Sequence, residues 1–489
     1  MTHPSPTPPG DHLPAPAVSP HALGSRWAPL RRGASAGSRL FAAAAWLGLA
    51  ACGGGGGGSS SGGGPAPSAS CSAADEKVWL RDFFADTYFW NTLAPRPDPA
   101  PFESATRYFS ALLYAGGDPI PSASGATWPR DRWSSSQSTE RYNQFYGEAR
   151  TMGYGLAVAG LEVKGQPTRP LYVRQVDPNS AAALNDVRRG DRVVSVNGRP
   201  ASELIAADDF SAFSATATGQ LLTLRLARGS AERDVSLASA VYDLVPVPQA
   251  QVVTTPGGRR VGYLQLQNFI SQAQAPLESR FAEFRAQGVQ EMVLDLRYNG
   301  GGLVSFSGTV ASHLGGTRAA GQVFASLVYA PSQASKNAVY RFASPAPAGA
   351  VNAPRVIVLM GRRTCSASEL VINGLRGAGL QVVGIGETSC GKPVGFVPGS
   401  NCGTTWSIVN FESLNARGEG RYFDGIAATC QVAEDFTQPV GASTDPLLAA
   451  ALSFSDSGSC PQPTARAVPL YRRSTADRPE PGERREMVP

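Results

Sequence analysis

Side chains able to do chemistry gather in two short segments, "TCSASELVINGLRG" (364–377) and "GETSCGKPVG" (386–395). The first places three hydroxyls and a thiol ahead of an apolar-periodic helix, so one serine is either a helix cap or a nucleophile. The second holds Lys392 between Gly391, which permits a turn, and Pro393, which favours an extended residue before it. Lys392 is therefore either a loop lysine near a turn or a functional group fixed in place.

Histidine, the usual base for a serine nucleophile, is scarce in this chain. His3, His12 and His21 precede the first apolar run, and His313 lies in the helix-like "SGTVASHLGG", where a packing role is expected. The sequence also lacks a G-x-S-x-G elbow, an H-E-x-x-H motif, a P-loop and a G-x-G-x-x-G after a strand. A hydrolase built on this chain needs another base, and a desolvated lysine can serve.

Composition excludes several classes of protein. The chain has 489 residues, enough for two or three domains, and its net charge of +5 is spread without a basic block in the folded part. We therefore expect no nucleic-acid partner. The cysteines form no C-x-x-C pair and one histidine remains after the leader, so we expect no metal and no cofactor.

The N-terminus is typical of an exported protein. Arg31, Arg32 and Arg39 precede the apolar run "LFAAAAWLGLAA", which ends in "LAAC" and is followed by "GGGGGGSSSGGG". This resembles the lipobox of bacterial lipoproteins, which implies acylation of Cys52, a flexible tether, and a membrane-anchored protein of the bacterial cell envelope that faces the periplasm. The alternative is an ordinary secretory signal.

The pattern along the chain predicts a multidomain α+β protein. We expect a signal peptide with lipobox (1–52), a Gly/Ser linker (53–70), a helical N-terminal domain (71–145) and a mostly β domain with one helix after "DPNS" (146–245). An α/β core of alternating strands and helices follows (246–460), with partly parallel strands. The Pro- and Arg-rich tail (461–489) has little apolar content, which favours disorder.

Four motifs in register resemble the tail-specific or carboxyl-terminal processing proteases, the S41 peptidases with a Ser/Lys dyad. These motifs are "DRWS", "VDPNSAAALNDVRRGDRVVSVNG", "VLDLRYNGGG" and the pair of segments described first. The resemblance covers most of 71–452. It implies a PDZ-like domain at 146–245, a protease core of the ClpP/crotonase-like type, serine endopeptidase activity and polypeptide substrates.

Residue by residue, the resemblance implies Ser366 as nucleophile and Lys392 as general base. The oxyanion donors would be Ala367 and either Gly301 or Gly302. Ser366 at a strand-to-helix junction agrees with this, because a helix N-terminus offers free N–H groups. Ser368 and Glu369 are interpreted as cap and first-turn residues.

Two departures from the family pattern concern the geometry of the dyad. Phe396 stands where the family commonly has a glutamine that orients the lysine, and the Ser366-to-Lys392 spacing is one residue longer. The PDZ-like domain implies peptide binding by strand addition, with Gly153, Tyr154, Gly155 and Leu156 as the carboxylate-binding loop. The alternative for this loop is an ordinary β-turn.

Two other functions remain open. "SCGK" (389–392) matches the S-x-x-K of penicillin-interacting acyltransferases, but Pro393 disfavours the helix that motif needs and no K-T-G follows. The second alternative is a non-catalytic peptide-binding lipoprotein scaffold, which the missing glutamine supports. An intact Ser366 and Lys392 argue against it.

Six cysteines remain after Cys52, and in an exported chain they suggest disulfides. We expect Cys71 with Cys460, because the ends of a domain are often close. We expect Cys402 with Cys430, because a strand, a turn and a return segment separate them. Cys365 would then pair with Cys390 and restrain the two dyad loops, while a local Cys390–Cys402 pair is the alternative.

Overall fold

The computed structural model describes residues 65, 67–68, 70–120, 125–462 and 487–488. The expected signal peptide, Cys52, nearly all of the Gly/Ser linker and most of the C-terminal tail lie outside these residues. Within the described part of the chain, no helix combines the length and the apolar character needed to cross a bilayer.

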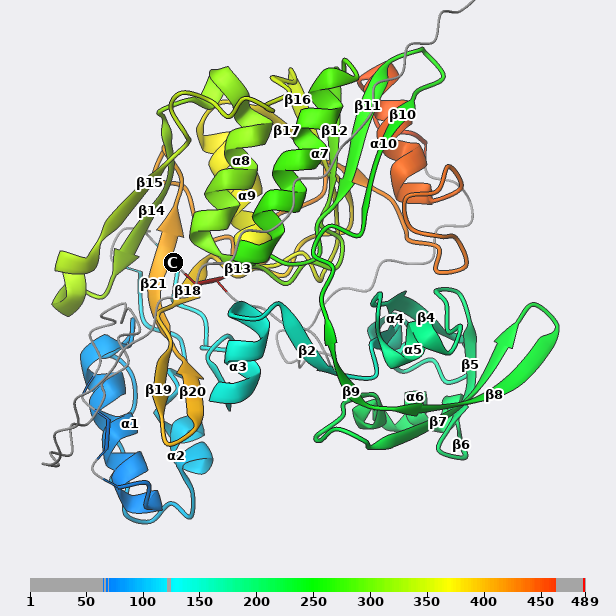
Figure 1. Cartoon of the computed structure of the whole chain (residues 1–489). Coiled ribbons are helices and arrows are strands. Elements are labelled where there is room, and N and C mark those ends of the chain that lie inside the picture. Colours follow the sequence, from blue (N-terminus) through cyan, green and yellow to red (C-terminus); the bar gives the residue numbers. More distant parts are fainter. Residues whose placement is uncertain (1–64, 66, 69, 121–124, 463–486, 489) are drawn as a thin grey trace, which may run out of the picture. The chain divides into compact units, whose positions relative to one another are not determined.

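Helices capped by serine side chains open the described chain (Figure 1). They are α1 (Ala73–Thr87), α2 (Ala105–Leu112) and α3 (Thr139–Tyr146). The hydroxyls of Ser72, Ser104 and Ser138 each accept a hydrogen bond from the backbone N–H three residues further on, which fixes the helix starts. The helical pattern expected from residue 76 to about 114 is therefore present as α1 and α2.

An aromatic cluster joins these helices to strands of the α/β core. Its fully or nearly fully buried members from the helical segment include Trp79, Phe83, Phe84, Tyr88, Trp90, Tyr108, Phe109, Trp128 and Trp133. Phe396 and Trp406 of the core belong to the same cluster. Burying such large rings is strongly stabilising, so the helical segment packs on the strands that follow Lys392.

Residues 150–243 form a β domain with its own core. The strands are β2 (Arg150–Gly153), β3 (Leu156–Val158), β4 (Leu171–Val176), β5 (Arg192–Val196), β6 (Arg199–Pro200), β7 (Leu221–Arg228), β8 (Ala231–Ala238) and β9 (Ala240–Asp243). The main sheet has the antiparallel order β3-β4-β5-β7-β8, and β2 pairs with β9.

The prediction of a single helix in this domain is wrong. Besides α5 (Ala181–Leu184) after "DPNS", the structure has α4 (Gly160–Val163) and α6 (Ala201–Ala207). These helices have four to seven residues. Fewer than two full turns give too little apolar periodicity to stand out in the sequence.

A six-stranded sheet forms the centre of the α/β core, in the order β10-β11-β12-β16-β17-β22. Its strands are β10 (Gln249–Thr254), β11 (Arg260–Gln265), β12 (Glu291–Asp295), β16 (Arg355–Met360), β17 (Gln381–Gly386) and β22 (Cys430–Gln431). From β11 to β22 all neighbours are parallel, and β10 is antiparallel to β11. The expected α/β pattern is therefore present.

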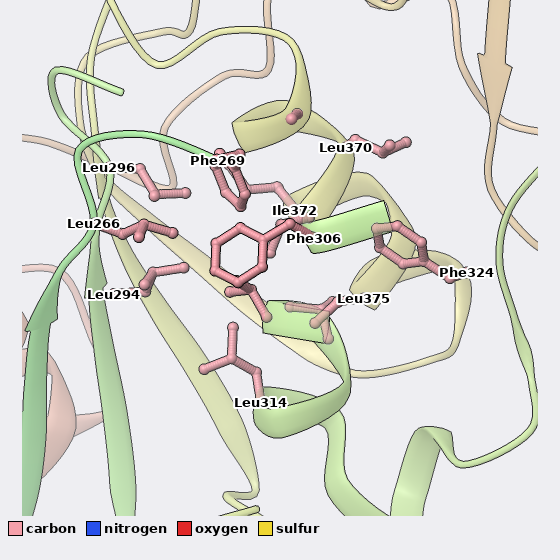
Figure 2. Close-up of a cluster of buried hydrophobic side chains, with 14 of the residues drawn as sticks. Leu266, Phe269, Leu294, Leu296, Phe306, Leu314, Phe324, Leu370, Ile372 and Leu375 are labelled. Atoms are coloured by element: carbon pink, nitrogen blue, oxygen red, sulfur yellow. The ribbon is translucent and has the colours of Figure 1, made fainter. Parts of the chain in front are cut away.

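Helices cover both faces of this sheet. They are α7 (Gln274–Ala286), α8 (Val304–Ala319), α9 (Ala367–Gly377) and α10 (Pro446–Ser457). Alternate residues of a strand point to opposite faces, so Leu294 packs with α7, α8 and α9 whereas Val293 packs with α10. Figure 2 shows part of the first of these layers, in which Leu294 and Leu296 belong to the same cluster as Leu314 and Leu375 of the helices.

Smaller sheets complete the core. One has the order β15-β14-β21-β18, another β1-β20-β19, and β13 pairs with β23. The strands are β1 (Ser135–Ser138), β13 (Gly302–Leu303), β14 (Val323–Tyr329), β15 (Ala338–Arg341), β18 (Val394–Phe396), β19 (Gly399–Asn401), β20 (Thr404–Ser407), β21 (Val409–Leu414) and β23 (Met487–Val488).

The six cysteines among the described residues form three disulfides, and two of these differ from the expected pairing. Cys365 is bonded to Cys390 as expected, but Cys71 pairs with Cys402 and Cys430 pairs with Cys460. Cys402 lies at the turn of the β19–β20 hairpin, which contacts α1. Cys430 lies in β22 at one edge of the large sheet, where α10 ends nearby. The return segment after "NARGEG" therefore does not bring Cys430 back to Cys402.

Candidate active site

Ser366 occupies the N-cap position of α9, directly after the loop that follows β16. Its backbone has φ 62° and ψ −115°. For a non-glycine residue such a conformation costs roughly 1–3 kcal/mol and persists only where the surroundings impose it. The loop is held by hydrogen bonds from Thr364 Oγ1 to Leu296 O (2.8 Å) and from Cys365 N to Asn299 O (3.0 Å).

The side chain of Ser366 has a capping-box arrangement with Glu369, but its hydroxyl makes no hydrogen bond. The residue is fully buried, and Oγ has no hydrogen-bond partner among the described residues. Burying a hydroxyl without a partner is unfavourable, and in native structures such a group calls for a functional explanation. This unpaired oxygen at a helix N-terminus is free to act as a nucleophile once a base comes within reach.

Lys392 lies on the loop between β17 and β18 and is fully buried. Its Nζ lies 3.7 Å from the centre of the Phe396 ring. A cation over an aromatic face is attracted to the ring, by about 2 kcal/mol when both are desolvated. Phe396, which stands where the resemblance leads one to expect glutamine, therefore contacts the lysine directly.

Glu369 ties the two loops together. Its carboxylate accepts hydrogen bonds from the backbone N–H of Ser366 (2.8 Å), Gly391 (2.8 Å) and Lys392 (2.9 Å), and from the hydroxyl of Ser389. Burial raises the pKa of Glu369, and these hydrogen bonds oppose that rise. The sequence suggested only a first-turn residue here, because its spacing to Ser366 is that of a capping box.

The Cys365–Cys390 disulfide is a second link between the same loops. The two Cα atoms are 5.2 Å apart, and the residues directly precede Ser366 and Gly391. Within the described residues, Cys365, Glu369 and Cys390 are also the one group of possible metal ligands with closely spaced donor atoms. Because its two sulfurs are joined to each other, this group offers no thiolate to a metal.

The glycine turn after β12 approaches the same place. Asn299 Oδ1 accepts the N–H of Gly301 at 2.9 Å, so this N–H is already engaged. Gly302 has φ 140°, and a Cβ there would collide with the carbonyl oxygen of Phe269, so only glycine fits. Ala367 is the first residue of α9 and its N–H has no acceptor within the helix. Ala367 and Gly302 are thus better oxyanion donors than Gly301.

A cavity of about 550 Å³ lies beside this turn. Its lining includes all four residues of the expected peptide-binding loop, Gly153 to Leu156, together with Gly300. Arg132, Arg141, Arg174 and Arg363 make the lining predominantly basic, against Asp177 as its single acid. Ser366 and Lys392 do not line it. The structure therefore places the expected carboxylate loop near the glycine turn but not in direct contact with the dyad.

Charged side chains connect the β domain to the Ser366 loop and to the glycine turn. Arg363, three residues before Ser366, forms an ion pair with Glu162 of α4 at 2.5 Å. Arg189 of the β domain donates to Tyr298 Oη at 2.6 Å and to Glu434 Oε1 at 2.8 Å. Tyr298 directly precedes Asn299 at the glycine turn. Sequence reasoning missed these residues, because single charges up to 245 positions apart leave no local signal.

His313 has a packing role, as the sequence suggested. It lies on α8, is nearly fully buried and stacks on Phe281 with ring centres 4.6 Å apart. Burial lowers the pKa of His313, which favours the neutral form of the ring.

Parts of this chain are similar to known proteins. Residues 260–399 match Peptidase family S41, and residues 172–228 match a PDZ domain. The chain is 28% identical over 252 residues to carboxyl-terminal-processing peptidase 3, chloroplastic, of Arabidopsis thaliana, which covers 48% of this chain and 45% of that protein. It is 28% identical over 246 residues to a chloroplastic C-terminal processing peptidase of Tetradesmus obliquus, covering 48% and 50%. The chain thus spans about half the length of the curated relatives it matches.

A solved structure extends the comparison to the fold. A Bacteroides fragilis protein assigned to the S41 proteases superposes with a TM-score of 0.59 at 21% identity, over 78% of this chain and 97% of that one. The chain therefore carries a PDZ domain and an S41 peptidase domain, and has the fold of an S41 protease. The resemblance to tail-specific processing proteases is confirmed.

Proposed function

We propose that this protein is a serine endopeptidase in which Ser366 is the nucleophile and Lys392 the general base. The observation that carries the proposal is the buried Glu369 carboxylate, which binds the backbone of both residues and so holds the two loops in one place. The unpaired Ser366 hydroxyl and the complete burial of Lys392 support it.

The reaction follows from these positions. Ser366 Oγ attacks the carbonyl carbon of the scissile peptide bond, and its proton passes to a neutral Lys392 amine. The N–H groups of Ala367 and Gly302 stabilise the oxyanion. Lys392 then gives the proton to the leaving amine and activates the water that hydrolyses the acyl-enzyme. Since Ser366 Oγ is not hydrogen-bonded in the described structure, substrate binding has to bring it within reach of Lys392.

The substrates we propose are polypeptides recognised by an unstructured segment or a C-terminus. The carboxylate loop of the PDZ domain, residues 153–156, lines the 550 Å³ cavity, whose basic character suits a terminal carboxylate. A peptide bound there by strand addition would extend past Gly300 towards the glycine turn.

We also propose export and lipid anchoring at Cys52, with the domain limits given by the sequence pattern. This part rests on "LAAC" and the glycine run that follows it. Metabolic labelling with a fatty acid should mark the wild-type protein and not Cys52→Ser, which should appear in the soluble periplasmic fraction. An unlabelled wild-type protein would exclude the anchor.

A direct test of activity uses the purified mature chain and an unstructured protein such as β-casein. We expect hydrolysis by the wild type, none by Ser366→Ala, and covalent labelling of Ser366 by a fluorophosphonate probe located by mass spectrometry. Peptide binding without hydrolysis or labelling would identify a non-catalytic scaffold instead.

A further inference from the structure

The last described residues of the chain form a strand beside the glycine turn. Met487–Val488, β23, pairs in parallel with Gly302–Leu303, β13, in the register Gly302 to Met487 and Leu303 to Val488. The same strand contacts β18, which follows Lys392. In Figure 1 this short dark red segment lies next to the labels β13 and β18. Residues 487–488 thus lie beside the glycine turn and contact the strand that follows Lys392.

The pairing uses the backbone groups that the reaction needs. On its other side β13 is bonded to Phe269, which donates to Gly301 O at 3.1 Å and accepts from Leu303 N at 2.8 Å. The N–H and C=O groups of neighbouring residues in an extended segment point to opposite sides. The backbone of Gly302 therefore faces β23, so the tail lies where the oxyanion donor of Gly302 would meet a substrate carbonyl.

We propose that residues 487–488 of the chain occupy the substrate position beside Gly302 as a pseudo-substrate and compete with peptide substrates in cis. This proposal rests on the proposed peptidase function, because it assigns the position alongside β13 to the substrate backbone. Strand addition is independent of side-chain identity, which allows a tail segment to imitate a substrate backbone. A segment on the same chain also acts at a high effective concentration, of millimolar order for a short linker, so weak pairing is enough.

The kinetic consequence is a change in KM without a change in kcat. If the tail is docked nine-tenths of the time, one molecule in ten is free to bind substrate, and the apparent KM is raised about tenfold. Saturating substrate displaces the tail. Because the contact is within one chain, specific activity at low substrate should not depend on enzyme dilution.

The test compares the full mature chain with a variant lacking residues 487–489. A deletion of residues 463–465 is the matched control, because it shortens the tail equally and retains the strand. A Met487→Pro/Val488→Pro variant keeps the length and removes both strand N–H donors. We expect the 487–489 deletion and the double proline variant each to have a KM for a peptide substrate about tenfold lower than the wild type, with kcat unchanged. The 463–465 deletion should match the wild type. Equal KM values in all four proteins overturn the proposal.

A second measurement separates this proposal from the activity itself. In the Ser366→Ala background, a fluorescent peptide "RREMVP" should bind the 487–489 deletion about tenfold more tightly than the full chain. That result holds whether or not the protein is a peptidase, and equal affinity overturns tail docking. Loss of C-terminal residues from the active chain but not from Ser366→Ala, seen by intact mass, would make the tail a substrate and overturn its inhibitory role.

Discussion

The unpaired hydroxyl of Ser366 and the buried amine of Lys392 define the first prediction at the scale of single residues. Ser366→Ala and Lys392→Ala should each lower kcat/KM by at least about a thousandfold, because a nucleophile and its base act as a unit. Lys392→Arg should be equally inactive, since a guanidinium does not release its proton. The measurement is hydrolysis of a fluorogenic peptide, with melting temperature as the check on folding.

A lysine on the surface provides the control for this series. Lys164 is paired with Asp208 at 2.7 Å and is partly exposed, so Lys164→Ala should leave activity unchanged and cost at most about 1 kcal/mol. Turnover by Ser366→Ala would refute the assignment of the nucleophile.

Phe396 gives a second prediction at this scale. Its ring contacts Lys392 Nζ at 3.7 Å, so Phe396→Leu removes the aromatic face while keeping an apolar side chain. We expect kcat to fall about five- to thirtyfold with KM unchanged, because the ring no longer stabilises the ammonium that forms on Lys392 when Ser366 is deprotonated, a loss of roughly 1–2 kcal/mol. Phe411→Leu is the matched control, because Phe411 lies opposite Gly395 on β21 and is also fully buried. An equal loss of kcat in both variants would assign Phe396 a packing role alone.

At the scale of elements, two disulfides of similar loop length can be compared, one beside Ser366 and Lys392 and one away from them. Cys365–Cys390 closes a loop of 25 residues beside the dyad, and Cys430–Cys460 closes a loop of 30 residues between β22 and the end of α10. Replacing either cysteine pair by alanine should lower the free energy of unfolding by roughly 3 kcal/mol, because the two disulfides close loops of similar length in the unfolded chain. Only the first replacement should also lower kcat. Comparable kcat losses after both replacements would show that the first disulfide has no specific effect on the site.

The ion pair between α4 and the Ser366 loop gives a pH-dependent prediction. Burial alone would raise the pKa of Glu162, but Arg363, helped by Arg362 and Arg174, lowers it to about 2 from 4.5. A lowered pKa stabilises the folded state above pH 4.5, and this contribution is lost as the pH falls towards 2. Glu162→Gln should therefore lower the free energy of unfolding by roughly 3 kcal/mol at pH 7. The difference in stability between variant and wild type should shrink as the pH falls from 5 to 2.

Thermal unfolding of the wild type and of Glu162→Gln across this pH range measures the difference in their stability. Asp208→Asn, which breaks an exposed ion pair in the same domain, serves as control and should change stability by less than about 1 kcal/mol. A stability difference between Glu162→Gln and the wild type that stays constant down to pH 2 would contradict this prediction.

At the scale of the whole molecule, the 550 Å³ cavity is lined both by the proposed carboxylate-binding loop, residues 153–156, and by Gly300 of the glycine turn. Gly155 has φ 76°, and a Cβ there would collide with the side chain of Ser180. Gly155→Ala should therefore distort the carboxylate loop and raise KM several-fold for long peptides with a free C-terminus. It should leave KM for the same peptides with an amidated end unchanged. Gly165→Ala, also at positive φ but with open space around it, is the control.

The sequence could predict what depends on local pattern. The order of strands and helices in the core, α1, α2 and the segments around Ser366 and Lys392 are of this kind, because periodicity and turn residues are encoded within about ten positions. Contacts between distant segments could not be predicted. Cys71 with Cys402, Glu162 with Arg363 and Arg189 with Glu434 each depend on how separate elements pack, which single residues do not reveal.

The Cys71–Cys402 and Cys430–Cys460 bonds have a mechanical consequence. Each lies near one end of the folded region and bonds that end to a β-strand or hairpin of the core. A pull on the chain ahead of Cys71 is transmitted through a covalent bond to the β19–β20 hairpin and does not unwind α1. A pull on the chain beyond Cys460 is likewise transmitted through the Cys430–Cys460 bond to β22 and does not unwind α10. Force applied at either end therefore bypasses the terminal helices and reaches the central sheets.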